Sequence, residues 1–193
     1  MPKLSGSSLP PDHANAPRRY YAPTGGLLPQ SRQPDDKAVF TTAYAVIPKS
    51  VMSDIVTSFL PHWQQTRLWV LARPLSGFAE TFSHYLVETA PSGGSTTPDD
   101  DASAQSVLFV VAGSLRLTLD GTTHDLEAGG YAYIPPGMDW QTTNVGGEHV
   151  LFHWIRKRYQ AVAGIDTPSA LVTSDAAVAP IEMPDCDGVW TTT

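Results

Sequence analysis

The chain is poor in cysteine and in charged residues. Cys186 is the single cysteine among 193 residues, so an intrachain disulfide is excluded and a reducing compartment is favoured. Only 16% of the residues are charged, and 19 acidic residues against 12 Lys and Arg give a formal net charge of −7. The one basic cluster is Arg156-Lys157-Arg158, which we expect to end a strand. This balance argues against nucleic acid and anionic membranes as partners.

Long apolar runs are also missing. No segment approaches the length of a membrane-spanning helix, and the polar start Met1–Gly6 lacks the apolar core of a secretion signal. We therefore expect a cytoplasmic protein. The chain does have 17 prolines, 15 glycines and 41% hydrophobic residues. That composition is typical of a turn-rich β protein with enough apolar residues for one core.

Alternating residues predict strands along the middle of the chain. Leu115, Leu117 and Leu119 alternate with polar residues, and Asp120-Gly121 directly after them predicts a hairpin. Segment 107–111 is an apolar, β-branched run. Segment 149–159 is apolar on both faces, which predicts a strand covered on both sides. Near residue 55 the apolar spacing fits either a short strand or one helical face. No other helix is expected.

The segment 129–144 carries the most specific pattern. Tyr131 and Tyr133 alternate with Ala132 and Ile134 as in a strand with two distinct faces. Pro135-Pro136 then ends the strand, because proline has no amide to donate. Gly137 allows a turn with positive φ, and Asn144 can close a turn with its side chain.

This segment reads G-x5-P-x-G-x2-W-x3-N and resembles the second motif of the cupin superfamily, in which a metal-binding histidine stands where this chain has Trp140. The first cupin motif reads G-x5-H-x-H-x3–4-E-x6-G. In this chain Gly113 matches its closing glycine, and Gln105 or Ser106 stands at the position of its glutamate. Asp99-Asp100-Asp101 lies where the paired histidines would be. The resemblance implies an all-β fold, a cupin double-stranded β-helix (jelly-roll barrel), without a metal site or catalytic residues.

Longer stretches resemble the N-terminal half of the (S)-ureidoglycine aminohydrolases, which are two-cupin enzymes of allantoin breakdown. The matching segments are 43–48, 82–88, 108–113, 129–137, 156–159 and 183–190. The resemblance implies that the family converts ureidoglycine and water to ureidoglycolate and ammonia, with manganese held in the C-terminal cupin. It also implies a small ureide substrate and a homo-oligomer.

From these patterns we divide the chain into three parts. Residues 1–37, rich in proline, serine and glycine, are expected to form an extended, partly disordered N-terminal arm. Residues 38–160 are expected to form a metal-free cupin barrel. Residues 161–193 are interpreted as a connector toward a second cupin that is absent from this chain. The barrel would then serve as scaffold, with no cofactor of its own.

An alternative function is a metal-free cupin that binds a small polar ligand without chemistry. The candidate residues for such a barrel pocket are Trp140, Gln105, His153 and His84. Two other sites were considered: carboxylate binding of a metal at residues 99–101, and zinc at His149 and His153, which share a strand face but need a third ligand. We favour a solvated loop at residues 99–101 and a strand without a metal at His149 and His153.

Overall fold

The computed structural model describes residues 39–41, 44–48, 56–57, 60–72, 81–182 and 190–192. The predicted arm at 1–37, Cys186 and nearly all of the stretch 183–193 lie outside the described residues. So do most of the residues for which a helical face near residue 55 was considered.

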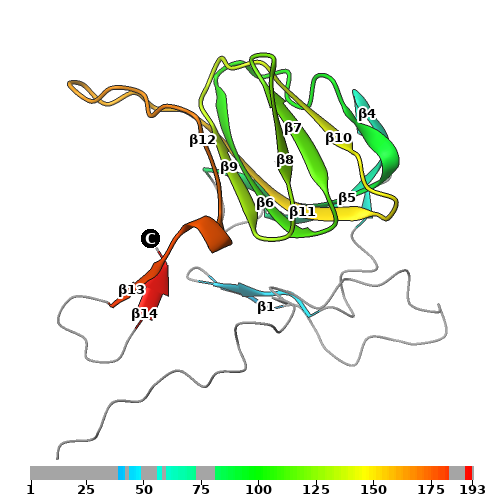
Figure 1. Cartoon of the computed structure of the whole chain (residues 1–193). Helices are drawn as coiled ribbons and strands as arrows, with labels where there is room; N and C mark the ends of the chain where they lie inside the picture. Colours follow the sequence, from blue (N-terminus) through cyan, green and yellow to red (C-terminus); the bar gives the residue numbers. More distant parts are fainter. Residues whose placement is uncertain are drawn as a thin grey trace, which may run out of the picture.

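The described part of the chain is built from β-strands and contains no α-helix, as the sequence predicts (Figure 1). One 3₁₀ turn, η3, occupies Asp175–Ala177. No helix within these residues is long and apolar enough to span a membrane. The strands are β1 (Val39–Phe40), β2 (Ala45–Val46), β3 (Val56–Thr57), β4 (Trp63–Ala72), β5 (Ser83–Ser95), β6 (Ala104–Ala112), β7 (Leu115–Leu119), β8 (Thr122–Leu126), β9 (Gly130–Ile134), β10 (Trp140–Asn144), β11 (Val150–Arg158), β12 (Leu171–Ser174), β13 (Pro180–Glu182) and β14 (Trp190–Thr192).

Ten of these strands form one antiparallel sheet that curls into a nearly closed barrel (Figure 1). The order is β12-β9-β6-β11-β5-β10-β7-β8, in which only the last two neighbours are consecutive in the chain, and β4 joins at β5 and carries β3. Strand β5 links two parts of the sheet, because it pairs with β4 and β11 along most of its length and with β10 at its end. This crossing order is that of the predicted jelly-roll barrel.

The end of β5 differs from the sequence prediction. Gly93, Gly94 and Ser95 have the composition of a loop, yet they belong to the strand, and Gly94 and Ser95 pair with β10. A Cβ on Gly94 would lie 2.1 Å from the carbonyl oxygen of Thr142, so only glycine permits this close approach of two backbones. The glycines that give this segment the composition of a loop are therefore the residues that allow β5 to pair with β10.

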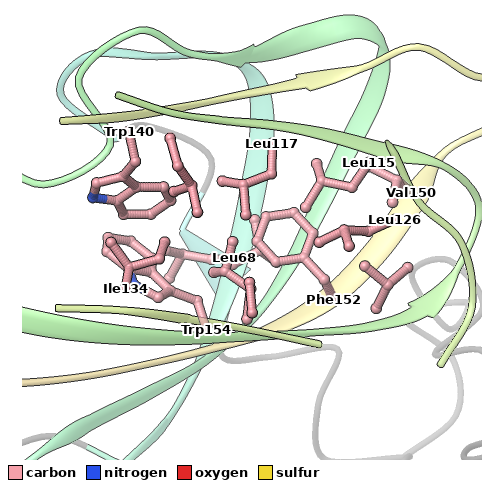
Figure 2. Close-up of a cluster of buried hydrophobic side chains, with 14 residues drawn as sticks. Leu68, Leu115, Leu117, Leu126, Ile134, Trp140, Val150, Phe152 and Trp154 are labelled. Atoms are coloured by element: carbon pink, nitrogen blue, oxygen red, sulfur yellow. The ribbon is translucent and has the colours of Figure 1, made fainter. Parts of the chain in front are cut away.

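The interior of the barrel is filled with apolar side chains. Figure 2 shows Leu115, Leu117 and Trp140, from β7 and β10, pointing toward Phe152 and Trp154 of β11. The buried cluster consists of Leu68, Val87, Leu108, Val110, Leu115, Leu117, Leu119, Leu126, Ala132, Ile134, Trp140, Val150, Phe152 and Trp154. The described interior of the barrel is thus a packed core.

A second apolar cluster covers the outer face of the sheet formed by β4, β5, β11 and β6. It consists of Trp69, Leu86, Val111 and Leu151, with Ile47, Leu71, Phe109 and Ala112 packed against it. This explains why segment 149–159 is apolar on both faces: successive residues of β11 alternate between the inner and the outer cluster. The expectation of a strand covered on both sides is confirmed.

The turn residues of segment 129–144 also act as predicted. Gly137 has φ of 77° directly after Pro135-Pro136. Asn144 is buried, and its Nδ2 donates to the carbonyl oxygens of Thr89 and Glu148, each at 2.8 Å. Its Oδ1 accepts from the Gly146 amide at 2.9 Å. One amide side chain therefore joins β10 to β5 and closes the turn before β11.

Candidate functional site

The two positions that would carry inward-facing metal ligands are taken up by a tryptophan and a serine. Trp140 lies inside the barrel, edge-on to Trp154 with ring centroids 5.9 Å apart. Ser106 is also buried, and its hydroxyl accepts a hydrogen bond of 3.1 Å from the Trp154 Nε1. Strand alternation therefore puts Ser106, rather than Gln105, on the inner face of β6.

The aspartates 99–101 form ion pairs with the end of β11. Asp99 has a side chain only 4% exposed, and its Oδ1 accepts from Arg156 Nη2 at 2.7 Å and from the Asp101 amide at 3.0 Å. Asp101 Oδ2 accepts from Arg158 Nε at 2.8 Å. The interpretation of this segment as a solvated loop is therefore wrong for Asp99, whose carboxylate is folded into the barrel end. As expected, the basic cluster ends a strand, β11.

The environments of these carboxylates shift their pKa values in opposite directions. Burial raises the pKa of Asp99, and the backbone hydrogen bond from Asp101 and the charge of Arg156 only partly offset that effect. Hydrogen bonds from Ser103 and Arg158 lower the pKa of the partly exposed Asp101 to about 2. The two groups are thus distinct: Asp101 is a surface ion pair, and Asp99 is a buried carboxylate.

A pocket of about 290 Å³ opens beside Asp99 at this end of the barrel. Its walls come from three places: the inner faces of β4, β5 and β11, the segment before β4, and the segment that contains Asp99. The lining residues are Leu60, Pro61, His62, Trp63, Leu68, Val70, Tyr85, Pro98, Asp99, Asp100, Trp154 and Arg156. A hydrogen bond of 3.1 Å from Trp63 Nε1 to the Pro98 carbonyl oxygen joins the two segments.

These residues do not fit a metal ion. At the positions of the cupin ligands, the indole of Trp140 has no lone pair available to bind a metal. The hydroxyl oxygen of Ser106 already accepts a hydrogen bond from Trp154. Among the described residues that line the adjoining pocket, Asp99 is the one buried carboxylate, and its partner is a guanidinium. Among the described residues no group of three or more His, Cys, Asp or Glu is placed to hold a metal. No step of catalysis through a metal can be derived for this barrel.

The structure does not bring the four predicted pocket residues together. Trp140 lies in the interior, whereas Gln105 is on the outer face of β6, where its Oε1 accepts a hydrogen bond of 2.9 Å from the Tyr133 hydroxyl. His84 and His153 also lie on the outer face, on β5 and β11, beside the outer apolar cluster. Both faces of these strands are partly apolar, so residue type alone did not distinguish inside from outside.

His84 and His153 nevertheless contact each other. His84 Nε2 and His153 Nδ1 are 2.9 Å apart, so one nitrogen donates and the other accepts. Burial, and then the neighbouring His153, lower the pKa of His84 to about 4, and burial also lowers the pKa of His153. His149 is exposed and pairs instead with Glu88 at 3.0 Å. The considered zinc site at His149 and His153 therefore lacks a third ligand among the described residues.

This pair predicts a loss of stability in acid. Because folding lowers the pKa of His84 from 6.5 to about 4, the unfolded chain binds a proton that the folded chain excludes between these pH values. Stability is then unaffected above pH 6.5 and falls as the pH decreases toward 4, by at most about 3 kcal/mol. Urea unfolding at pH 7 and pH 4.5 measures this fall.

His84→Gln keeps a hydrogen-bonding partner for His153 but cannot titrate, and we expect it to reduce the acid sensitivity. Titration of the His84 ring followed by NMR provides the direct check. A midpoint at or above the ordinary value of 6.5 would contradict the prediction.

Comparison with known families agrees with this geometry. A family model described as an EutQ-like cupin domain matches residues 76–159, which include strands β5 to β11 of the barrel. Residues 76–159 thus match a cupin domain. The cupin double-stranded β-helix predicted from segment 129–144 is thereby confirmed.

The predicted resemblance to the (S)-ureidoglycine aminohydrolases is confirmed as well. The chain is 27% identical over 110 residues to the (S)-ureidoglycine aminohydrolase of Escherichia coli strain K12, an alignment that covers 57% of this chain and 41% of that protein. The chain thus spans less than half the length of this curated relative.

Two solved structures resemble the chain over most of its length. A glyoxylate-induced protein of Pseudomonas aeruginosa is 56% identical, with a TM-score of 0.77 and coverage of 89% of this chain and 62% of that one. Protein Ylba of E. coli is 22% identical, with a TM-score of 0.67 and coverage of 76% and 59%, and supports the fold alone. In both cases more than a third of the other chain has no counterpart here.

Proposed function

We propose that this cupin is the metal-free, N-terminal portion of an (S)-ureidoglycine aminohydrolase-like protein and acts as scaffold. The proposal depends on the contact of Trp140 and Ser106 with Trp154. These packed side chains fill the space in which a cupin metal would need its ligands. The similarity to the E. coli aminohydrolase supplies the reaction class.

In this proposal the chemistry belongs to a second cupin. Manganese, the ureide substrate and the groups that orient it would all lie there, since the described residues of this barrel offer no fitting set of metal ligands. When bound, the metal would supply a Lewis acid that activates water. The role of the present barrel would be to pack against the second cupin and against other copies in a homo-oligomer, in the cytoplasm.

The proposal predicts that the 193-residue chain alone does not release ammonia from (S)-ureidoglycine above a no-protein blank. A chimera is the matched comparison: this chain joined to the portion of the P. aeruginosa relative that has no counterpart here. We expect the chimera and the intact relative to hydrolyse the substrate in a manganese-dependent way. Elemental analysis of the dialysed chain alone should find well below one manganese or zinc per molecule.

Two results would contradict it. Ammonia release by the chain alone that a chelator does not abolish would place the chemistry in this barrel. Inactivity of both the intact relative and the chimera would remove the substrate assignment. Trp140→His in the chimera gives an internal control, because one imidazole without further ligands is not expected to add a second metal.

The alternative, ligand binding without chemistry, is supported by a different observation. The pocket beside Asp99 is lined by aromatic rings and by charged groups, a combination that suits a small polar molecule. It differs from the pocket predicted from the sequence, because Gln105, His84 and His153 do not line it.

A further inference from the structure

A long loop, residues 160–170, leaves the barrel at the end of β11 and returns to it as β12 (Figure 1). Residues 160–169 of this β11–β12 loop are all exposed, so the loop has little contact with its own barrel. Its tip is apolar: Val162 and Ile165 are 57% and 65% exposed, and Gly164 between them turns the chain with φ of 78°. The Ile165 amide donates to the Val162 carbonyl oxygen at 3.1 Å and closes this turn. Such a tip gains free energy when a second surface covers it.

A groove of about 340 Å³ lies beside the root of the loop and is mostly apolar. It lies on the outer face of the sheet, where Ile155 of β11 pairs with Val107 of β6, and Val107 pairs with Tyr133 of β9. These residues alternate with members of the inner core, which places them outside. Tyr133 also pairs with Leu171, the residue at which the loop rejoins the barrel. The lining residues are Thr81, Phe82, Gln105, Ser106, Val107, Tyr133, Ile155 and Lys157.

The loop and the groove are complementary in charge as well as in polarity. Asp166, next to the apolar tip, is the single charged residue between positions 160 and 170, and Lys157 is the single charged residue of the groove lining. Neither forms an ion pair with another residue in the described part of the chain. An apolar residue followed by a carboxylate on the loop therefore matches an apolar wall next to an ammonium group in the groove.

Every copy of the chain carries both surfaces, and it carries them side by side. Ile165 at the tip is six residues from Tyr159 and six from Leu171, so it can reach on the order of 20 Å from the root of the loop. Because loop and groove adjoin on one copy, a two-fold axis between two copies can bring each loop to the groove of the other. Such a contact is closed and does not extend into a filament.

We propose that the β11–β12 loop packs into the groove of a second copy of this chain, which returns the same contact, so that the two form a two-fold symmetric dimer. Ile165 then packs against the partner's Val107 and the partner's Ile155, and Asp166 pairs with the partner's Lys157. This names a contact surface for the homo-oligomer of the proposed scaffold role and does not depend on the aminohydrolase assignment.

The size of the two surfaces indicates a weak dimer. Loop and groove together supply fewer than the roughly 20–30 residues a side of a standard interface, so we expect a Kd on the order of 10–100 µM. At the low micromolar concentrations of an unfolding experiment the chain is then mostly monomeric. Truncation of Ile165 therefore leaves the measured stability of the single barrel nearly unchanged.

Ile165→Asp tests the apolar tip. Sedimentation equilibrium of the full 193-residue chain, from about 5 to about 500 µM, measures the dimer. The substitution places a carboxylate in the apolar groove twice per dimer, and we expect the Kd to rise at least tenfold. Val145→Asp is the matched control, because Val145 is 42% exposed and lies in the loop before β11, at the opposite end of that strand from Lys157. It should leave the Kd unchanged, and circular dichroism confirms that both variants are folded.

Asp166→Lys and Lys157→Asp test whether the partner is a second copy. Each variant alone sets like charges against each other at both contacts, and we expect the Kd to rise at least threefold. In an equimolar mixture the changed loop of one variant meets the changed groove of the other, and the unchanged loop meets the unchanged groove. A mixed dimer should then form with the original Kd. Glu148→Lys makes the same change of net charge at an exposed position before β11 and should have no effect.

Three results would overturn the proposal. The first is a chain that stays monomeric at about 500 µM, which would leave the groove to another partner or to the loop of the same copy. The second is an unchanged Kd in the folded Ile165→Asp variant. The third is a mixture of the two charge variants that associates no better than either alone, which would assign the self-association to another face. A failed ammonia assay with the dimer intact would remove only the aminohydrolase assignment.

Discussion

Phe152→Ala is expected to lower the free energy of unfolding by about 3–5 kcal/mol. Phe152 is fully buried in the middle of β11, stacks with Trp63 at a centroid distance of 6.3 Å, and is paired with Val87 of β5 and Val110 of β6. Its removal leaves a cavity where two strands and the facing wall of the barrel meet. Urea unfolding followed by circular dichroism measures the loss.

The control for this variant is Ile165→Ala. Ile165 is 65% exposed, so its truncation removes little buried surface and should change stability by no more than about 0.5 kcal/mol. The packed-core interpretation would be contradicted if Phe152→Ala cost less than about 1 kcal/mol, because that would mean an interior able to collapse around the gap.

Asn144→Asp should be comparably destabilising at neutral pH, although the two side chains have nearly the same shape. The Asn144 Nδ2 donates to the carbonyl oxygens of Thr89 and Glu148, and a carboxylate oxygen in its place would face both of them without a proton. Breaking such a buried network costs about 3–5 kcal/mol. The cost should decrease at low pH, where the introduced carboxyl is protonated and donates one bond.

Gln141→Glu is the matched control, since it makes the same amide-to-carboxylate change on the same strand at an exposed position. We expect it to change stability by no more than about 0.5 kcal/mol. Equal stability of the two variants at pH 7 would show that Asn144 acts only through its shape, against the hydrogen bonds described above.

The strands were predictable because their signals are local. The Asp120-Gly121 hairpin, the turn at Gly137 after Pro135-Pro136, and the two-sided burial of segment 149–159 all depend on residues close in the sequence. The replacement of a metal-binding histidine by Trp140 could also be predicted locally, from the spacing of the motif. Chain composition and alternation indicated a turn-rich β protein, and the resemblance of segment 129–144 to a cupin motif implied the barrel.

The location of the pocket could not be predicted, since it depends on residues distant in the sequence. Asp99 meets Arg156 across 57 positions, and Trp63 reaches Pro98 across 35. Only the strand order of the barrel brings β4 and β11 together with residues 98–100. Within the sequence, three consecutive aspartates in a Gly, Ser and Thr context are typical of a solvated loop.

The alternation of side chains along a strand also shows which residues share a face, but it does not show which face lies inside the barrel. On β5 and β11, His84 and His153 alternate with Tyr85 and Trp154, and both sets include partly apolar neighbours. The sequence by itself determined that these are covered strands of a cupin lacking its usual ligands. Only the closure of the sheet decided that the histidines face outward and the aromatic rings inward, because the sign of its curvature depends on all ten strands together.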